Sequence, residues 1–281
     1  TGHLLYSRFW TKFLKDIKAI PVEEPFQKMI NQGMILGESA FVFRKPNENV
    51  FVSYDRVDDD NFQPIHADVS YVNTSDELDV EAFKTWRKEF ADAEFVFNDD
   101  EKFIVKREVE KMSKSKYNVV NPDDICEEYG ADSLRLYEMF LGPLEQSKPW
   151  NTAGISGVHS FLKKTWRLFH SHPDQPETFY VTDDEPNKES LKTLHKTIKK
   201  VREDLDAFSF NTSVSSFMIC VNELQKQNCS SQEILEPLAI LLSPFVPHIA
   251  EELWEKLGYS NSIADAKFPV YQEKFLKDDT K

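Results

Sequence analysis

Apolar residues recur at helical spacing at the beginning of the chain. They form a wide stripe: Leu5, Tyr6, Phe9, Trp10, Phe13, Leu14 and Ile17. This stripe predicts an amphipathic helix whose apolar side packs on a sheet. Pro21 and Pro25 then mark a connection, and the next apolar positions predict a short helix at residues 26–30.

The pattern changes to strands between residues 33 and 109. Gly33 stands beside apolar residues and leads into the alternating positions 40–43, which predict a strand. Residues 45–109 are crowded with acids and turn formers between short predicted strands at 50–54 and 103–105. One helix is predicted there, at residues 79–90. We interpret residues 45–109 as a small α+β insertion, here called the inserted module.

Two helices are predicted after residue 120. Asn121 is a good N-cap, Pro122 suits the first helical position, and Gly130 suits the end of the helix. The second helix is expected to begin with Asp132 as its cap and to stop at the Gly-Pro pair 142–143.

From about residue 149 onward the pattern is entirely helical. Five apolar stripes follow one another, and Asn211 is the predicted cap of the third helix. Alternating spacings of three and four residues are typical of helices in a bundle. The chain is therefore predicted to be α/β followed by all-α, with one domain at 1–148 and a helical bundle at 149–281.

Composition and charge narrow the function classes. The chain has 281 residues, is 40% hydrophobic and carries a net charge of −14, so it can bury a core but does not suit non-specific nucleic-acid binding. No apolar run is long enough to cross a membrane, and the beginning lacks a signal-peptide pattern, which predicts a cytoplasmic protein. The three cysteines, Cys126, Cys220 and Cys229, form no Cys-x-x-Cys pair. We therefore expect no structural disulfide and no protein-bound metal.

One stretch carries a distinct chemical signal: Lys111, Met112, Ser113, Lys114 and Ser115, here called the lysine loop. Its lysines are separated by small residues and can place two ammonium groups on one polyphosphate. Such a loop suits attack on a nucleotide triphosphate, because positioned lysines stabilise the charge that develops on the phosphates. The alternative is a solvated lysine loop, which is the more common meaning of two lysines at this spacing.

A second basic group lies on the predicted bundle, where lysines recur four residues apart from Lys188 to Lys200. Like charges at this spacing cost about 0.2–0.5 kcal/mol per pair, and contact with phosphates would offset that cost. The alternative is an ordinary solvated helix face. The candidate nucleic-acid contacts are Lys163, Lys164, Arg167, Lys192, Lys196, Lys199 and Lys200.

The lysine loop resembles the KMSKS signature of the class I aminoacyl-tRNA synthetases. Residues 128–143 extend the resemblance with Glu-Tyr-Gly-Ala-Asp-Ser-Leu-Arg-Leu-Tyr-Glu-Met-Phe-Leu-Gly-Pro. This text is similar to the leucyl branch of the family, of bacterial type, whereas the isoleucyl, valyl and methionyl branches share the Gly-Ala-Asp…Leu-Arg frame but usually not Tyr-Glu-Met-Phe. The similarity covers most of the chain.

The resemblance implies a fold and an activity. The chain would be the C-terminal part of a Rossmann-like catalytic domain, followed by an anticodon-binding-type helical domain that meets tRNA. Leucine and ATP, accompanied by Mg²⁺, would form leucyl-adenylate, and the leucyl group would then pass to tRNA-Leu. Lys111 and Lys114 would hold the β- and γ-phosphates, with Lys114 more important in the transition state, while Ser113 and Ser115 would shape the loop.

The resemblance also implies roles for residues near the beginning of the chain. Gly33, Met34 and Ile35 correspond to a stretch that touches adenine through main-chain atoms, although spacing alone favours a simple turn into a strand. His3 would lie near the amino-acid side-chain pocket; the alternative is a surface histidine.

The sequence contains no His-x-Gly-His run, which forms the other half of a class I site. We therefore expect a truncated, monomeric chain that does not aminoacylate on its own but belongs to a tRNA ligase. Two alternatives stay open. One is a non-catalytic tRNA-binding module that kept the lysine loop, and the other is a segment of an isoleucyl or valyl synthetase.

Overall fold

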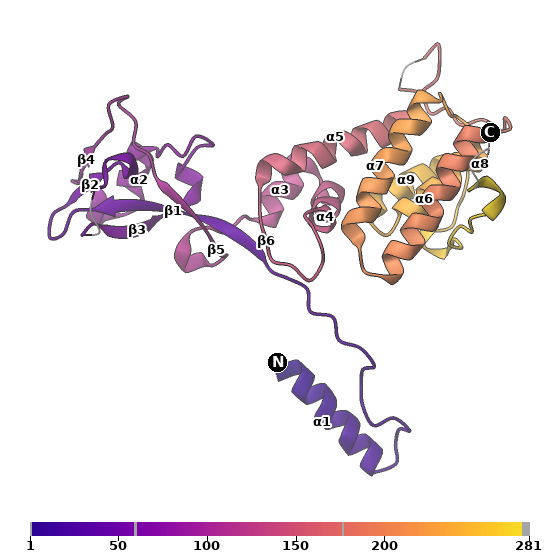
Figure 1. Ribbon diagram of the computed structural model, residues 1–281, viewed down its shortest axis with the longest axis horizontal. Helices are drawn as coiled ribbons and strands as arrows, with labels where there is room; N and C mark the ends of the chain where they lie inside the picture. Colours follow the sequence, from indigo (N-terminus) through magenta and orange to yellow (C-terminus); the bar gives the residue numbers. More distant parts are fainter. Residues whose placement is uncertain (1, 59–60, 176, 277–281) are drawn as a thin grey trace.

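The computed structural model describes residues 2–58, 61–175 and 177–276. Each predicted domain has residues that lie outside the described ones. These are residue 1 in the first domain, residues 59–60 in the inserted module, and residues 176 and 277–281 in the helical domain. A mixed sheet with short helices is followed by a helical region, as the sequence predicts (Figure 1).

The helix at the beginning of the chain is present as α1 (Gly2–Asp16), but it does not pack on the sheet. None of its residues is buried, and Figure 1 shows it apart from both the sheet and the bundle. The short helix predicted at residues 26–30 is absent, and residues 22–34 lie in neither a helix nor a strand. Phe26 and Met29, the expected apolar side of this helix, are exposed, so no packing stabilises so short a helix.

The sheet is organised around the long strand β1 (Ile35–Arg44). It pairs antiparallel with β2 (Val50–Val52), β3 (Gln63–Ala67) and β5 (Lys106–Lys111), and parallel with β6 (Lys148–Pro149). β4 (Glu94–Val96) extends the sheet beside β2. The strand expected at 103–105 was placed too early: it lies at β5, and residues 103 and 105 instead supply the buried side chains Phe103 and Val105.

The inserted module has its own aromatic core. Phe51, Phe83, Phe90 and Phe103 are buried in it. The single helix predicted at 79–90 is α2 (Val80–Trp86), which the extended backbone of Arg87 separates from a 3-10 turn at Lys88–Phe90. This break allows the rings of Phe83 and Phe90 to stack with centroids 4.8 Å apart, so burial of both rings explains why the helix is interrupted.

The two helices after the lysine loop are α3 (Pro122–Tyr129) and α4 (Ala131–Phe140). Asn121 caps α3 by accepting a hydrogen bond from the Asp123 N–H at 3.2 Å, as predicted. Asp132 does not cap its own helix. Its carboxylate accepts hydrogen bonds from the N–H groups of His248, at 3.3 Å, and Ile249, at 2.8 Å. Asp132 therefore caps the start of a later helix, the one that contains His248 and Ile249.

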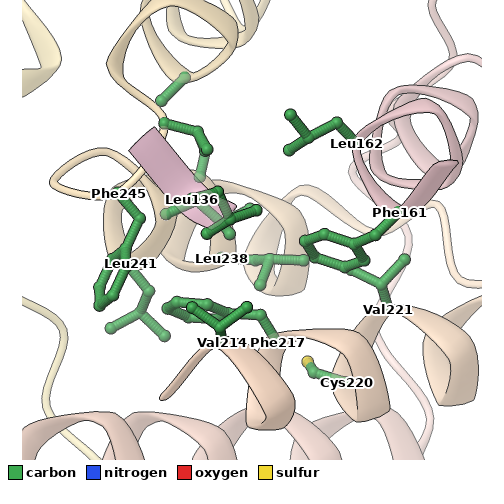
Figure 2. Close-up of a cluster of buried hydrophobic side chains, with 14 of the residues drawn as sticks. Leu136, Phe161, Leu162, Val214, Phe217, Cys220, Val221, Leu238, Leu241 and Phe245 are labelled. Atoms are coloured by element: carbon green, nitrogen blue, oxygen red, sulfur yellow. The ribbon is translucent and has the colours of Figure 1, made fainter. Parts of the chain in front are cut away.

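The helical region forms one core with α4. Figure 2 shows Leu136 of α4 among Phe161, Val214, Leu238 and Phe245. Asn211 is not the cap of the third helix, because Ser209 precedes that helix and Asn211 lies in its first turn. The helices of this region are α5 (Thr152–Phe169), α6 (Lys188–Asp206), α7 (Phe210–Lys226), α8 (Gln232–Leu242) and α9 (Pro247–Lys256).

Candidate functional site

The lysine loop connects the end of a strand to the start of a helix. Lys111 is the last residue of β5, and Lys114 begins a 3-10 turn that ends at Lys116. Tyr117 follows with a left-handed backbone, φ 53°, and the chain then enters α3. Lys111 and Lys114 are both exposed. The loop therefore presents two ammonium groups to solvent from a backbone that is ordered at both ends.

The buried side chain of Asn118 connects both ends of the loop. Its oxygen accepts a hydrogen bond from the Ser113 N–H at 2.8 Å. Its amide nitrogen donates to the Ser39 hydroxyl at 2.9 Å and to the Lys111 carbonyl at 3.3 Å. Within the loop, the hydroxyls of Ser113 and Ser115 lie 2.8 Å apart and share a hydrogen bond. Asn118 thus fixes the loop to β1 as well as to itself.

The strand beneath the loop must come very close to it. A Cβ atom built on Gly37 would lie 2.5 Å from the backbone oxygen of Asn118, so any larger residue would push β1 and the loop apart. The same strand pairs Leu36 with Lys111. Because Leu36 follows Ile35, the register brings the adenine-contact candidates and the first loop lysine to one end of the sheet.

The backbone groups of Gly33 and Met34 contact the segment that leads into β6. The Gly33 N–H donates to the Leu144 carbonyl at 2.8 Å, and the Met34 N–H donates to the Ser147 hydroxyl at 3.2 Å. The Met34 carbonyl accepts from the Lys148 N–H at 2.9 Å. A Cβ atom at Gly33 would lie 2.0 Å from the backbone oxygen of Gln146. The two chain segments pack so closely here that the fold itself requires glycine at this position.

A cavity of about 290 Å³ opens beside this segment. Gly33, Ile35, Glu138 and Lys148 are among the residues that line it. Burial lowers the pKa of Lys148 and raises that of Glu138, because desolvation disfavours the charged form of each group. The lysines of the loop do not line this cavity.

Charge beside the loop is organised around Glu110. Its carboxylate forms an ion pair with Lys116 and lies 3.0 Å from the Nε2 atom of His66. The hydrogen bond from Lys116, followed by those from Ser39 and His66, lowers the pKa of Glu110 to about 2. Lys116 is therefore neutralised locally, and the exposed positive charge of this region belongs to Lys111 and Lys114.

His3 is not brought to this site. It lies in α1, is exposed, and its carbonyl accepts a hydrogen bond from the Ser7 hydroxyl at 2.9 Å. Figure 1 shows α1 apart from the strands that carry the lysine loop.

The basic candidates on α5 line a cavity of about 520 Å³ between α4, α5 and α9. Lys163 and Arg167 share it with the rings of Tyr129, His159 and Trp166. Cations beside aromatic rings suit a nucleic acid, because they can meet a phosphate and a base together. The third candidate on this helix, Lys164, turns towards α7, where its ammonium lies 3.4 Å from the Asn222 side-chain oxygen.

The lysines of α6 differ in their surroundings. Lys200 forms an ion pair with the buried carboxylate of Asp204, and Lys199 lies 5.6 Å from the centre of the Tyr271 ring. Lys196 is exposed and Lys192 is half-buried. α7 packs against both α5 and α6, so the two basic groups lie on either side of it. The basic residues on α5, which could have extended the group on α6, are in this way separated from it.

The described residues contain neither a cluster of metal-ligating side chains nor a membrane-spanning helix. No group of three or more His, Cys, Asp or Glu residues among them is arranged to hold a metal ion. Among the described helices, none combines the length and apolar character needed to cross a membrane.

Sequence reasoning did not identify Asn118, Tyr117 or Arg87 as important for the loop. The only signal for Asn118 is its place directly after the loop, where asparagine is common for many reasons. Arg87 is distant in sequence, and its side chain donates a hydrogen bond to the Tyr117 hydroxyl at 2.6 Å. Only the fold brings these residues together.

Two protein-family models match parts of the chain. Residues 97–148 match the tRNA synthetases class I (I, L, M and V), and residues 187–281 match the anticodon-binding domain of tRNA ligase.

Similar proteins agree with these matches. The leucine–tRNA ligase of Christiangramia forsetii is 67% identical over 100% of this chain, and that of Flavobacterium johnsoniae is 64% identical over 100%. The chain covers 29% of each of these relatives. A LeuRS from Agrobacterium radiobacter K84, solved as a LeuRS-tRNA-LeuAMS ternary complex, matches 99% of the chain with a TM-score of 0.62 and 26% identity; the match covers 28% of that structure.

Proposed function

Because this chain is a segment of the leucine–tRNA ligase family, spanning about 29% of the curated relatives it matches, we propose that it works within a leucine–tRNA ligase. In that enzyme it supplies the phosphate-binding lysine loop and a helical surface for tRNA. The single observation that carries this proposal is the lysine loop itself, with two exposed lysines on an ordered backbone between β5 and α3.

The proposed reaction begins with leucine and ATP, and Mg²⁺ enters with ATP as part of the substrate. The leucine carboxylate attacks the α-phosphate, a new carboxyl–phosphate bond forms, and pyrophosphate leaves. Lys111 and Lys114 bind the β- and γ-phosphates and stabilise the charge that grows on pyrophosphate as the bond breaks. The family pattern gives Lys114 the larger share in the transition state, and closure of the loop would complete the site.

The neighbouring residues support this role by holding the loop rather than by touching the reacting atoms. Ser113 and Ser115 link to each other through their hydroxyls, and Asn118 connects Ser113 with Lys111. Met112 belongs to the same loop. The Gly33 N–H, the Met34 N–H and the Met34 carbonyl are hydrogen-bonded within the chain, so other main-chain atoms of residues 33–35 would meet adenine at the end of β1, beside Lys111.

The second half of the reaction needs tRNA-Leu, and the bundle offers two basic surfaces for it. Lys163 and Arg167 line an aromatic cavity on α5, and Lys192 and Lys196 lie on α6. We assign residues 1–148 to the catalytic domain and 149–281 to the tRNA-binding domain, although α4 shares the core of the bundle. We expect a monomeric enzyme that acts in the cytoplasm, where tRNA is aminoacylated.

An exchange assay tests the proposed activity. In the presence of leucine, the complete enzyme should transfer the label from pyrophosphate into ATP. This transfer should be much slower with isoleucine, valine or methionine. A preference for isoleucine or valine would contradict the leucine assignment and support the alternative synthetases. No exchange with any amino acid would support a non-catalytic tRNA-binding module.

A salt titration tests the tRNA surface separately. The complete enzyme should bind tRNA-Leu more weakly as salt rises, because phosphate contacts release counterions. Lys192→Glu/Lys196→Glu and Lys163→Ala/Arg167→Ala should each weaken binding and reduce the salt dependence. Unchanged binding in both variants would mean that these lysines and this arginine do not contact tRNA.

A further inference from the structure

The cavity beside α5 combines exposed cations with half-buried rings. It has a volume of about 520 Å³ and opens between α4, α5 and α9. Lys163 and Arg167, one helical turn apart on α5, line it and are exposed. The rings of Tyr129, His159 and Trp166 also line it and are half-buried. A phosphate can therefore stay at the surface beside the cations while a flat group attached to it reaches the rings.

The ring of His159 is held so that one of its nitrogens stays available. The Ser133 hydroxyl donates a hydrogen bond to the Tyr129 carbonyl at 2.7 Å, so it can only accept from the Nδ1 atom of His159, which lies 3.1 Å away. The neutral imidazole therefore carries its proton on Nδ1, and its Nε2 atom is an acceptor. Within the part of the chain that the structure describes, no residue forms a hydrogen bond with this Nε2 atom.

The interior of the cavity also contains a carboxylate. Asp132 lines the cavity and is buried, and its carboxylate already accepts hydrogen bonds from the Ile249 N–H at 2.8 Å and from the His248 ring at 2.8 Å. A buried carboxylate repels a phosphate, but its remaining lone pairs can accept from a neutral N–H group. The interior therefore suits a flat, neutral group with N–H donors, whereas an anion suits only the exposed side.

The rings of the cavity are held in place by neighbouring rings. Trp166 stacks on His170, with centroids 3.9 Å apart and planes 17° apart. Tyr129 and His159 meet edge to face, with centroids 5.7 Å apart. Because these rings are already ordered, binding a ligand against them costs little further side-chain entropy. Ordered rings beside cations are the combination by which proteins bind single-stranded nucleic acid.

We propose that this cavity binds one unpaired nucleotide of the tRNA. The base of that nucleotide contacts the rings of His159 and Trp166 and donates an N–H group to the Nε2 atom of His159. The phosphates on either side of the nucleotide meet Lys163 and Arg167. A base inside a paired stem has its donors engaged and its faces stacked, so only a nucleotide of a loop or bulge can enter.

This inference rests on the proposed function and deepens it. It makes part of the basic surface on α5 a subsite for a single nucleotide, where a plain basic surface would meet only the backbone of a stem. The two kinds of contact respond differently to salt, because phosphate contacts release counterions and contacts with a neutral base do not.

The first test is the binding of tRNA-Leu by the complete enzyme at several salt concentrations. His159→Ala should weaken binding by about tenfold and leave the slope of log Kd against log salt unchanged, since it removes a base contact. Lys163→Ala should lower that slope by about one, since it removes a phosphate contact. His172→Ala is the matched control and should bind as wild type does, because this histidine follows α5 and is not among the residues that line the cavity.

His159→Phe separates the ring from its acceptor atom. It keeps an aromatic ring in the cavity but loses Nε2, so binding should weaken by about threefold, which is less than in His159→Ala. Equal binding by His159→Phe and wild type would contradict the hydrogen bond from the base.

A photo-crosslink identifies the bound nucleotide directly. Glu177 is an exposed residue of the cavity and makes none of the proposed contacts. With Glu177 replaced by the photoreactive amino acid p-benzoylphenylalanine, irradiation should attach the complete enzyme to one unpaired nucleotide of tRNA-Leu, seen as a single stop in reverse transcription. Adding His159→Ala to this protein should reduce the crosslink, and adding His172→Ala should not.

Three results would overturn the proposal. The first is a crosslink spread over paired stem nucleotides, or no crosslink in a protein that binds tRNA-Leu fully. The second is binding by His159→Ala that equals binding by His172→Ala. The third is a change of the salt slope in His159→Ala like that in Lys163→Ala. If the wild-type enzyme itself does not bind tRNA-Leu, the proposed function fails as well, whereas normal wild-type binding with any of the three results removes this inference alone.

Discussion

The side-chain oxygen of Asn118 accepts a hydrogen bond from the backbone N–H of Ser113 at 2.8 Å, across the turn of the lysine loop. The same side chain reaches Ser39 in β1, so one buried residue connects the loop to the central strand. The backbone of the loop is therefore held by hydrogen bonds, while the side chains of Lys111 and Lys114 are exposed.

Asn118→Ala should slow leucine activation without unfolding the protein. It leaves the partly buried Ser113 N–H without its partner and removes the hydrogen bond that Asn118 donates to Ser39, which costs about 1–3 kcal/mol of stability. The rate of ATP–pyrophosphate exchange should fall because the loop backbone no longer holds Lys111 and Lys114 in fixed positions relative to each other. The KM for leucine is the internal control and should stay constant. A loss of stability with a normal exchange rate would mean that Asn118 serves the fold alone.

Asp132→Ala should destabilise the contact between α4 and α9. The Asp132 carboxylate accepts hydrogen bonds from two N–H groups at the start of α9 and from the His248 ring at 2.8 Å. Losing them should lower the free energy of unfolding in urea by about 2–4 kcal/mol. Glu127→Ala, an exposed carboxylate on α3, should change it by less than about 0.5 kcal/mol. Equal effects of the two substitutions would rule out a capping role for Asp132.

Stability should depend on pH through Glu110. Lys116, Ser39 and His66 lower the pKa of Glu110 to about 2, below its ordinary value of 4.5. A lowered folded-state pKa contributes stability that is fully present above the unfolded pKa and is lost as the pH falls towards the folded one. The stability difference between wild type and Glu110→Gln should therefore shrink between about pH 5 and pH 3. Glu108→Gln is the control, and a difference that stays constant over this range would contradict the assignment.

Local sequence signals predicted the helices well where the cap and the apolar stripe agree. Asn121 and Pro122 begin α3, and Gly130, with φ 87°, ends it. The order of a mixed sheet followed by a helical region also followed from the change in periodicity. These features depend on residues within one turn of each other, which a sequence displays directly.

The errors share a physical cause. Asp132 is a good cap by type, but the helix that it caps is α9, more than 100 residues later. The helix predicted at 79–90 is broken at Arg87 because the module core takes both Phe83 and Phe90. α1 has an apolar stripe, yet none of its residues is buried in this structure. In each case a tertiary contact, or its absence, decides the outcome.

The candidate site divides in the same way. The lysines of the loop were singled out by the resemblance of residues 111–115 to a family signature, since their spacing alone favours a solvated loop. Asn118, Tyr117 and Arg87 could not be identified, because their importance comes from a strand register and from an inserted module that folds back on the loop. The division of the basic residues by α7 was equally hidden, since spacing along a helix does not show what lies beside it.

The most direct test of the central claim is leucine-dependent ATP–pyrophosphate exchange by the complete enzyme carrying Lys114→Ala. The exchange rate should fall by about two orders of magnitude, since a positioned charge at the leaving phosphates is removed. Lys102→Ala, an exposed lysine of the inserted module, should exchange at the normal rate. The melting temperature should be the same in all three proteins because Lys114 is exposed. Normal exchange by Lys114→Ala would contradict the assignment of the lysine loop to the triphosphate.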